Sequence, residues 1–288
     1  MNKYIQSFRL RTLPLSMSGI ILGSGTAYSL CADKPHFWIV FSLAILTTLS
    51  LQILSNLSNE LGDAQHGTDD NQQARVAYGL QTGAITENEM RHLIGVFVGL
   101  CIIFGTALVW TAFGTLLQLQ SIIFLALGAF AIVGAMTYTL GKHNYGYKGL
   151  GDLGVFLFFG LLSTMGSYYL QTQTMTWQVA WSAVALALPI VGVLNLNNIR
   201  DMDNDRQHGK HTFAGRLGKK GGKIYHTFLI VGCLTIFTIL GRYLTLCIIP
   251  FWTWHLIDVW RLPDNKLDRQ MPVLMFTTII VAVLACFF

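Results

Sequence analysis

Charged residues are scarce in this 288-residue sequence, because Asp, Glu, Lys and Arg together make up only 11% of it. A typical soluble domain carries about 25% charged residues. Hydrophobic residues make up 53% of the chain. The shortage of charge therefore excludes an ordinary soluble domain and indicates a protein that lies in a membrane.

Several chemical motifs are also absent. The five cysteines form no CxxC pair and no His/Cys spacing typical of a metal site. The sequence contains no GxSxG run and no HExxH run, so it offers no sign of nucleophilic catalysis or of a zinc protease. Gly149, Gly151 and Gly154 spell GxGxxG, but no strand precedes them and an apolar stretch follows, which excludes a dinucleotide site.

Long apolar stretches dominate the remainder of the chain. A stretch of about 20 apolar residues is long enough to cross the hydrocarbon core of a bilayer as a helix. The sequence predicts about nine such spans, at residues 12–30, 36–58, 92–112, 119–140, 151–170, 178–197, 224–240, 243–260 and 271–288. The expected fold is an all-α integral membrane bundle that forms a single domain over residues 1–288.

The distribution of basic residues predicts the orientation of this bundle. If the N-terminus is cytoplasmic, the inner segments hold 17 of the 19 Lys and Arg residues, and only Lys34 and Arg242 lie outside. Cytoplasmic loops of membrane proteins are enriched in Lys and Arg. The net charge of +5 thus reflects topology, and we expect no nucleic-acid partner. The long inner connections 59–91 and 198–223 place the working face on the cytoplasmic side.

Small residues at a spacing of four predict close helix contacts. Gly19 and Gly23 form one such pair, and Gly95 and Gly99 form another. Pairs of this kind let two membrane helices approach closely. We therefore expect both pairs to lie at helix interfaces.

Two short polar runs at helix ends resemble each other. An offset of 142 positions aligns Asn56 with Asn198, Asn59 with Asp201, and Asp63 with Asp205. The Gln-His-Gly at 65–67 then falls on the Gln-His-Gly at 207–209. Because the offset is close to half the chain, it suggests a duplicated helical unit, and repeats of membrane proteins often place a site at their interface.

The spacing within each run points to metal binding. On a helix, Asn56, Asn59 and Asp63 lie within about 60° of one another, and the second run repeats this cluster. Asp203 points away from its neighbours and is left out. Mg²⁺ prefers carboxylate and amide oxygens together with the oxygens of a bound phosphate. The expected metal ligands are Asn59, Asp63, Asp201 and Asp205, with Asn56 and Asn198 beside them.

Three further residues could act on a phosphate group. Tyr138 and Lys142 lie four apart at the inner end of the fourth span, which predicts a shared helix face. Lys210 follows Asp205 by five residues and is the basic loop residue expected to reach a phosphate. His66 and His208 follow the acidic runs, but they show no ligand spacing and are interpreted as loop residues.

At these residues the chain resembles the UbiA family of intramembrane prenyltransferases. That family carries an Asn/Asp-rich motif after its second helix and a DxxxD motif after its sixth. The similar segments are 9–14, 52–67, 81–86, 149–152 and 197–210. Within the family, they are most similar to the branch that prenylates 1,4-dihydroxy-2-naphthoate in menaquinone synthesis. In one departure, Glu60 stands where the family usually has Asp.

The resemblance implies a bundle around a central cavity and an Mg²⁺-dependent transfer. A polyprenyl diphosphate would bind with its tail in the bilayer and its head on Mg²⁺, beside Tyr138 and Lys142. Arg9 or Arg75 would hold the acceptor carboxylate, which is lost as CO₂. Phe156, Phe158 and Phe159 could shield an allylic cation, although core packing is the better explanation for them.

Other functions remain open at this point. Another UbiA-type acceptor, such as 4-hydroxybenzoate, homogentisate or haem, would use the same acidic motifs. A secondary transporter with repeated halves would instead place its ionisable residues near the bilayer midplane. A structural membrane protein would need no matched acidic runs.

Overall fold

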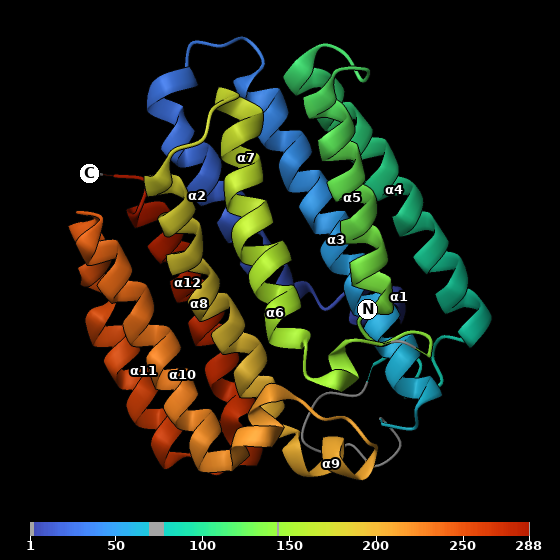
Figure 1. Cartoon of the computed structure of the whole chain (residues 1–288). Helices are drawn as coiled ribbons and strands as arrows, with labels where there is room; N and C mark the ends of the chain where they lie inside the picture. Colours follow the sequence, from blue (N-terminus) through green and yellow to red (C-terminus); the bar gives the residue numbers. More distant parts are fainter. Residues whose placement is uncertain (1–2, 69–77, 143, 288) are drawn as a thin grey trace.

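The computed structural model describes residues 3–68, 78–142 and 144–287, and every regular element in this part of the chain is a helix. The helices pack side by side as a bundle (Figure 1). Their bounds are α1 Lys3–Ser7, η1 Leu10–Thr12, α2 Leu13–Cys31, α3 Phe37–Gln65, α4 Glu87–Phe113, α5 Leu119–Thr137, η2 Gly146–Lys148, α6 Gly151–Val155, η3 Phe156–Leu162, α7 Ser163–Thr172, α8 Trp177–Arg200, α9 Met202–Gln207, α10 Phe213–Ile239, η4 Tyr243–Ile248, α11 Ile249–Arg261, η5 Asp264–Arg269 and α12 Gln270–Leu284.

Among the described residues, 7 helical segments are long and apolar enough to span a membrane. They are α3, α4, α5, α8, α10 and the continuous segments Gly151–Thr172 and Asp264–Leu284. The two other predicted stretches fall on α2, with 19 residues, and on η4 with α11, of which α11 has only 13. Pro250 lies in the first turn of α11, where a missing N–H is tolerated. The all-α membrane fold is confirmed, whereas the count of nine full spans is not.

The α8 helix lies at the centre of the bundle. Of its most apolar stretch, 72% is buried, the largest share among the spans. It packs against α10, η3 and α12. Gly160 of η3 approaches α8 so closely that an added Cβ would lie 2.2 Å from the Cβ of Ala187. Small residues therefore set the spacing of these helices.

The two glycine pairs differ in their surroundings. An added Cβ at Gly19 would lie 1.9 Å from Ser163 Oγ, and one at Gly23 would lie 2.2 Å from the carbonyl oxygen of Thr164. These glycines bring α2 against α7, as predicted. At Gly95 and Gly99 of α4, an added Cβ would meet no described atom within 4 Å. The predicted helix contact of this second pair is wrong, because that side of α4 faces away from the bundle.

The outer surface of the bundle is apolar. Trp38 of α3 is 60% exposed, and Ile103 of α4 and Phe130 of α5 are each 62% exposed. Soluble monomers rarely expose large contiguous apolar patches, whereas lipid chains can cover them. Together with the spanning helices, this surface makes the chain a multi-pass membrane protein.

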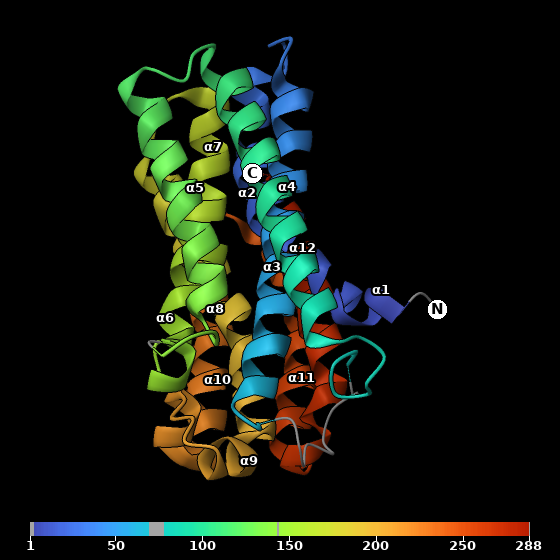
Figure 2. The ribbon, with the colours of Figure 1, turned by 90° about the vertical axis from the view of Figure 1, so that its right-hand side faces the viewer.

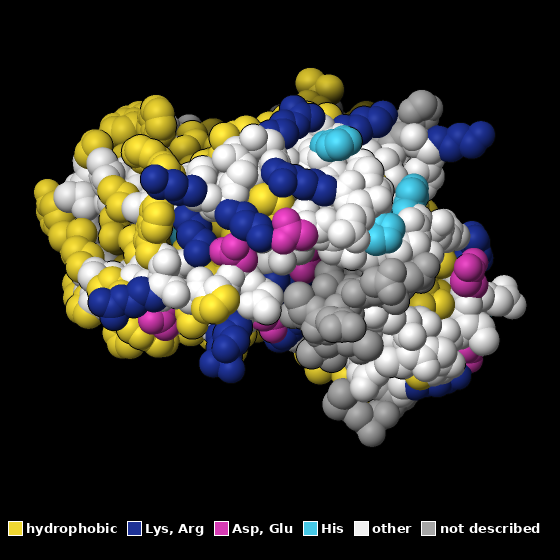
Figure 3. Space-filling model, turned by 90° about the horizontal axis from the view of Figure 1, so that it is seen from below, with side chains coloured by type: hydrophobic (Ala, Val, Ile, Leu, Met, Phe, Trp, Pro, Cys, Tyr) yellow, Lys and Arg dark blue, Asp and Glu magenta, His cyan; other side chains and the backbone are white. Residues whose placement is uncertain are grey.

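Both acidic motifs lie at one end of the bundle. The end of α3 and the short helix α9 are at the bottom of Figures 1 and 2, next to the start of α10. Seen from below, Lys and Arg side chains gather over this end, with Asp, Glu and His among them (Figure 3). The fold thus brings together two helix ends that are far apart in the sequence.

Candidate active site

The first acidic motif lies on the last turns of α3. The helix is unbroken there, so Asn56, Asn59 and Asp63 share one face as predicted. Asn56 and Asp63 are each only 4% exposed. The Asn56 amide donates to the carbonyl of Phe8 at 2.9 Å and to the hydroxyl of Thr12 at 3.1 Å. Asn56 therefore fixes the N-terminal segment against α3.

The second acidic motif is divided between two helices. The α8 helix ends one residue before Asp201, which has φ −93° and ψ 3°, and α9 begins one residue after it. Asn198, Asp201 and Asp205 are all buried. The Asp203 side chain is 69% exposed, so it points away as predicted. The prediction that the residues of each motif lie on one helix is therefore confirmed for the first motif only, because the backbone bends at Asp201.

The turns that follow the two motifs have the same backbone structure. Gly67 and Gly209 are both left-handed, with φ 69° and 72°. In each turn the next amide donates to the carbonyl of the last motif aspartate, at 3.0 Å and 2.8 Å. A ring nitrogen of His66 and of His208 contacts the carbonyl four residues earlier, at 2.7 Å and 2.9 Å. These matching contacts support the internal repeat and give both histidines a structural part in the turns.

Tyr147 and Lys210 connect the two motifs. The Tyr147 hydroxyl donates to Asp63 Oδ1 at 3.0 Å. The Lys210 ammonium lies 3.4 Å from Asp205 Oδ1 and 5.6 Å from the centre of the Tyr147 ring. A cation over an aromatic face is attracted by the ring. A tyrosine bound to the first motif and a lysine paired with the second therefore meet between the two motifs.

The charge states follow from burial and from these contacts. Burial raises the pKa of Asp205 to about 6, with Lys210 opposing the shift and nearby acids adding to it. Burial lowers the pKa of Lys210, but the carboxylates of Asp205 and Asp63 outweigh burial and leave that pKa above its ordinary value. Burial also raises the pKa of Tyr147, so its phenol stays protonated and can donate. Lys210 is a permanent cation at this site.

Arg200 holds Asp201 and links it to the C-terminal helices. Its side chain is 2% exposed, and Nε and Nη2 donate to the two oxygens of Asp201 at 2.7 Å and 2.6 Å. Its Nη1 donates to Asp268 Oδ1 at 2.6 Å. Asp268 also accepts from Arg11 Nη1 at 3.2 Å. Asp268 of η5 thus joins the N-terminal segment to the second motif.

Arg9 extends from a left-handed turn. Its φ of 51° and ψ of 56° lie in a region that costs a non-glycine residue about 1–3 kcal/mol. Its guanidinium carbon lies 4.1 Å from the centre of the Tyr78 ring. Its Nε and Nη2 are buried and have no hydrogen-bond partner within the described ranges. A buried guanidinium with unused donors is suited to an anionic ligand group.

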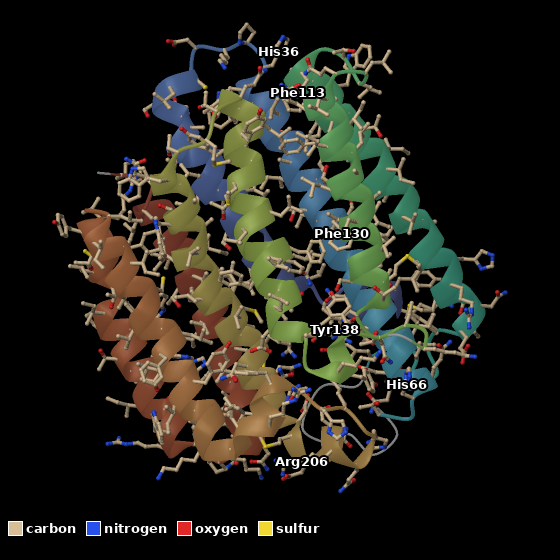
Figure 4. The ribbon with its side chains drawn as sticks, in the orientation of Figure 1. His36, His66, Phe113, Phe130, Tyr138 and Arg206 are labelled. Carbon is tan, nitrogen blue, oxygen red and sulfur yellow. The ribbon has the colours of Figure 1, made fainter. Side chains whose placement is uncertain are left out.

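A cavity of about 340 Å³ adjoins these residues and extends between the helices. Most of its lining is apolar, from α2, α3, α5, η3, α8 and α12. The predicted site residues that line it are Arg9, Asn56, Asn59, Asp63, Tyr138, Asn198 and Lys210. Asp201 and Asp205 contact the lining residues Arg200 and Lys210 from behind. Figure 4 shows Tyr138 near the lower end of α5, above His66 at the end of α3.

A π-helical turn shapes one wall of the cavity. The segment η3 interrupts the helix between α6 and α7. Such turns are rare and are frequent at functional sites. Phe158 and Phe159 of this turn line the cavity, whereas Phe156 does not. The turn therefore presents two of the three predicted aromatic rings to the cavity.

One of the predicted basic residues, Lys142, is not brought to this cluster. Lys142 is exposed and does not line the cavity. The α5 helix ends before Tyr138, and Gly141 has φ 82°, so Tyr138 and Lys142 do not share the helix face that their spacing predicted. Arg75 lies outside the described residues.

Glu60 is buried but does not line the cavity. Its Oε1 accepts from the hydroxyl of Ser7 at 3.2 Å and from the amide of Leu80 at 2.8 Å. These contacts hold α1 and the connection before α4 against α3. The position where the family usually has Asp therefore has an anchoring part in this chain.

Sequence reasoning missed Tyr147, Arg200 and Asp268. Arg200 lies inside the second polar run, and its position next to Asp201 is the feature of the sequence that could have identified it as a site residue. Tyr147 lies two residues before Gly149, and the signal of that stretch in the sequence is its GxGxxG glycines and not a phenol. Asp268 belongs to no motif, and only the folded chain brings it to Arg200.

The donor atoms fit Mg²⁺ only when a phosphate completes its coordination. Within residues 3–68, 78–142 and 144–287, no three His, Cys, Asp or Glu side chains form a metal-binding group. Mg²⁺ in phosphate sites commonly uses one or two carboxylates, waters and phosphate oxygens. Asp205 Oδ2 and Asn198 Oδ1 are buried oxygens without a hydrogen-bond partner in the described chain. These oxygens suit a hard cation.

Comparison with known proteins agrees with this geometry. Residues 19–280 match the model of the UbiA prenyltransferase family. The chain belongs to the UbiA prenyltransferase family. As a UbiA protein, it is an enzyme of the prenyltransferase class, and the predicted family and fold class are confirmed.

Two bacterial relatives of this UbiA protein are each 40% identical to it. One is 1,4-dihydroxy-2-naphthoate octaprenyltransferase of Escherichia coli K12, aligned over 255 residues that cover 87% of this chain and 79% of the relative. The other is the protein of the same name from Haemophilus influenzae, aligned over 226 residues that cover 78% of this chain and 72% of the relative.

Solved UbiA homologues share the fold. The apo structure from Aeropyrum pernix K1 has a TM-score of 0.67 at 17% identity and covers 98% of this chain and 96% of its own. The homologue from Archaeoglobus fulgidus bound to DMAPP and Mg²⁺ has a TM-score of 0.64 at 14% identity, with coverage of 98% and 99%. At these identities the likeness concerns the fold alone.

Proposed function

We propose that this UbiA-family protein transfers a polyprenyl group from polyprenyl diphosphate to 1,4-dihydroxy-2-naphthoate, with loss of CO₂, to give demethylmenaquinol, the hydroquinone form of demethylmenaquinone. The observation that carries the proposal is the junction of two acidic motifs, through Tyr147 and Lys210, beside an apolar cavity. The names of the two relatives at 40% identity support the naphthoate acceptor.

The diphosphate would bind between the motifs, with its prenyl tail in the cavity. Asp63 and Asp205, with Asn59 and Asp201, would hold Mg²⁺. The UbiA homologue of the same fold that is bound to DMAPP and Mg²⁺ supports the use of this metal. The bound metal would neutralise charge on the leaving diphosphate. Lys210 adds a second, preorganised positive charge at the same place, where little water screens it.

The chemistry begins when the allylic C–O bond of the donor breaks and the electron pair leaves with the diphosphate. Lys210 stabilises the charge that develops there. The apolar walls exclude water, which would otherwise capture the allylic cation. Phe158 and Phe159 line the cavity and can stabilise that cation through their ring faces.

The acceptor then attacks through the ring carbon that carries its carboxylate. A new C–C bond forms to the prenyl group, the bond to the carboxylate breaks, and its electrons restore the aromatic ring as CO₂ leaves. No ring proton has to be removed, so this step needs no general base. Arg9 would hold the carboxylate; its buried Nε and Nη2, which have no hydrogen-bond partner among the described residues, and its position in the cavity lining support this role.

We place the site on the cytoplasmic side of the inner membrane, with the N-terminus also inside. The basic residues support this orientation, since 17 of the 19 would then lie in inner segments. In the structure, Lys and Arg gather at the end that carries both motifs (Figure 3).

The test is an acceptor assay with purified protein in lipid nanodiscs. With Mg²⁺, polyprenyl diphosphate and 1,4-dihydroxy-2-naphthoate, we expect diphosphate and CO₂ in equal amounts, and no turnover when EDTA replaces Mg²⁺. Matched reactions contain 4-hydroxybenzoate or homogentisate instead. Diphosphate release without CO₂, or turnover only with 4-hydroxybenzoate, would move the protein to another branch of the family.

A further inference from the structure

Lys210 occupies a position where a divalent cation would also be attracted. Its side chain is only 10% exposed, and its ammonium lies 3.4 Å from Asp205 Oδ1. It also interacts electrostatically with Asp63, the aspartate of the other motif. The Tyr147 ring supports the ammonium at 5.6 Å, and the Tyr147 hydroxyl holds Asp63. Lys210 thus contacts the acid of the second motif and acts electrostatically on the acid of the first.

Asp205 retains unused binding capacity beside Lys210. Asp205 Oδ2 is buried, and no described group donates a hydrogen bond to it. Asp201 is already compensated, because both of its oxygens accept from Arg200. Beside the ammonium of Lys210, Asp205 therefore keeps a buried oxygen that can take a further ligand. A divalent ion would be attracted to it and would repel the ammonium.

We propose that Lys210 and the divalent cation compete for Asp63 and Asp205, and that Lys210 moves to the diphosphate when metal and diphosphate bind together. The inference rests on the proposed function, and it concerns the coupling of the two ligands. Without metal, Lys210 compensates the acids and keeps them from repelling each other. With metal and diphosphate present, the new anion gives the ammonium a partner.

This exchange makes the two ligands bind cooperatively. Metal alone has to separate Lys210 from the acids without offering the lysine a new partner, so it binds weakly. Metal with diphosphate meets no such penalty. Coupling free energies between sites typically correspond to factors of about 5–150 in affinity. Because coupling is reciprocal, the metal strengthens diphosphate binding by the same factor.

The experiment measures Mn²⁺ binding by electron paramagnetic resonance in nanodiscs. Mn²⁺ is titrated into wild-type protein and into Lys210→Gln. Each titration is done with and without a non-reactive prenyl thiodiphosphate. The binding of Mn²⁺ to the thiodiphosphate in buffer alone is measured and subtracted. Lys210→Arg tests whether charge alone is sufficient. Lys219→Gln is the matched control, because Lys219 also pairs with an aspartate of the second motif, Asp203 at 2.7 Å, but is exposed.

The exchange predicts effects of opposite sign in Lys210→Gln. Mn²⁺ alone should bind about fivefold tighter or more, the thiodiphosphate should bind more weakly, and the coupling factor should fall toward one. Lys219→Gln and Lys210→Arg should remain near wild type in Mn²⁺ affinity. If Lys210 had only a structural role, Lys210→Gln would bind both Mn²⁺ and the thiodiphosphate more weakly.

Two results would overturn the exchange. In the first, folded Lys210→Gln binds Mn²⁺ alone no tighter than wild type does, although wild type binds Mn²⁺ in the presence of the thiodiphosphate. The lysine then does not compete with the metal, and the metal assignment stands. If wild type binds no Mn²⁺ with or without the thiodiphosphate, the metal assignment fails and the exchange fails with it.

Discussion

The Tyr147 hydroxyl donates a hydrogen bond to Asp63 Oδ1 at 3.0 Å, across 84 positions of sequence. The same hydroxyl lies 2.6 Å from Thr68 Oγ1, so it also restrains the turn that follows α3. Tyr147 thereby fixes the carboxylate of the first motif in front of the loop that carries Lys210.

Tyr147→Phe keeps the ring beneath Lys210 and removes the hydroxyl. A hydrogen bond to a charged group is worth about 1.5–3 kcal/mol, which corresponds to a loss of roughly 10- to 100-fold in kcat/KM if Asp63 acts in the transition state. Steady-state kinetics with the naphthoate acceptor measure this change in kcat/KM. Tyr243→Phe is the control, because Tyr243 is 64% exposed. Equal activity of the two variants would show that the hydroxyl does not position Asp63.

Asp63→Asn and Asp205→Asn should each lower kcat by about 10²–10³, the usual effect of removing one electrostatic contact to a developing anion. Asp203→Asn is a matched control from the same motif, since its side chain is 69% exposed and contacts Lys219. It should retain near-full activity. Near-full activity of folded Asp63→Asn would end the assignment of the first motif to the diphosphate.

Asp268→Asn should lower thermal stability and turnover together. The change removes the negative charge between Arg11 and Arg200, and breaking a fully buried ion pair costs about 3–5 kcal/mol. We expect less here, because the Asp268 side chain is 25% exposed. Thermal unfolding in nanodiscs measures the effect. Glu87→Gln, which breaks the exposed pair between Glu87 and Arg91, is the control and should cost at most about 1 kcal/mol. A smaller loss for Asp268→Asn than for this control would contradict the bridging role.

Glu60→Ala should destabilise the fold without abolishing the metal requirement. The change leaves the buried Ser7 hydroxyl and the Leu80 amide without this acceptor, at about 1–3 kcal/mol for each unmet donor. Glu60→Gln, which keeps an acceptor oxygen at the same reach, should recover most of the stability. If Glu60→Gln is stable but loses Mn²⁺ binding, Glu60 is a ligand and not an anchor.

The helices and the acidic motifs could be predicted because their signals are local. Apolar length predicted the spans, and the spacing of Asn56, Asn59 and Asp63 predicted their common face on α3. The offset of 142 led to two turns that have the same hydrogen bonds. Lys210 was found from its distance in sequence to Asp205 alone.

The rest of the site depends on contacts between distant segments. Asp268 meets Arg200 only because η5 packs against α8, and no pattern near Asp268 reports that contact. The shared face predicted for Tyr138 and Lys142 fails because the helix ends and Gly141 turns the chain.

The central claim is that the two acidic motifs form one site for a divalent cation and a prenyl diphosphate. A structure of the protein with Mn²⁺ and a prenyl thiodiphosphate, with anomalous scattering to locate the metal, tests this claim directly. The account predicts a manganese peak that contacts Asp63 or Asp205 and an oxygen of the diphosphate, with the prenyl chain in the cavity. A manganese peak elsewhere, or a diphosphate away from both motifs, would contradict it.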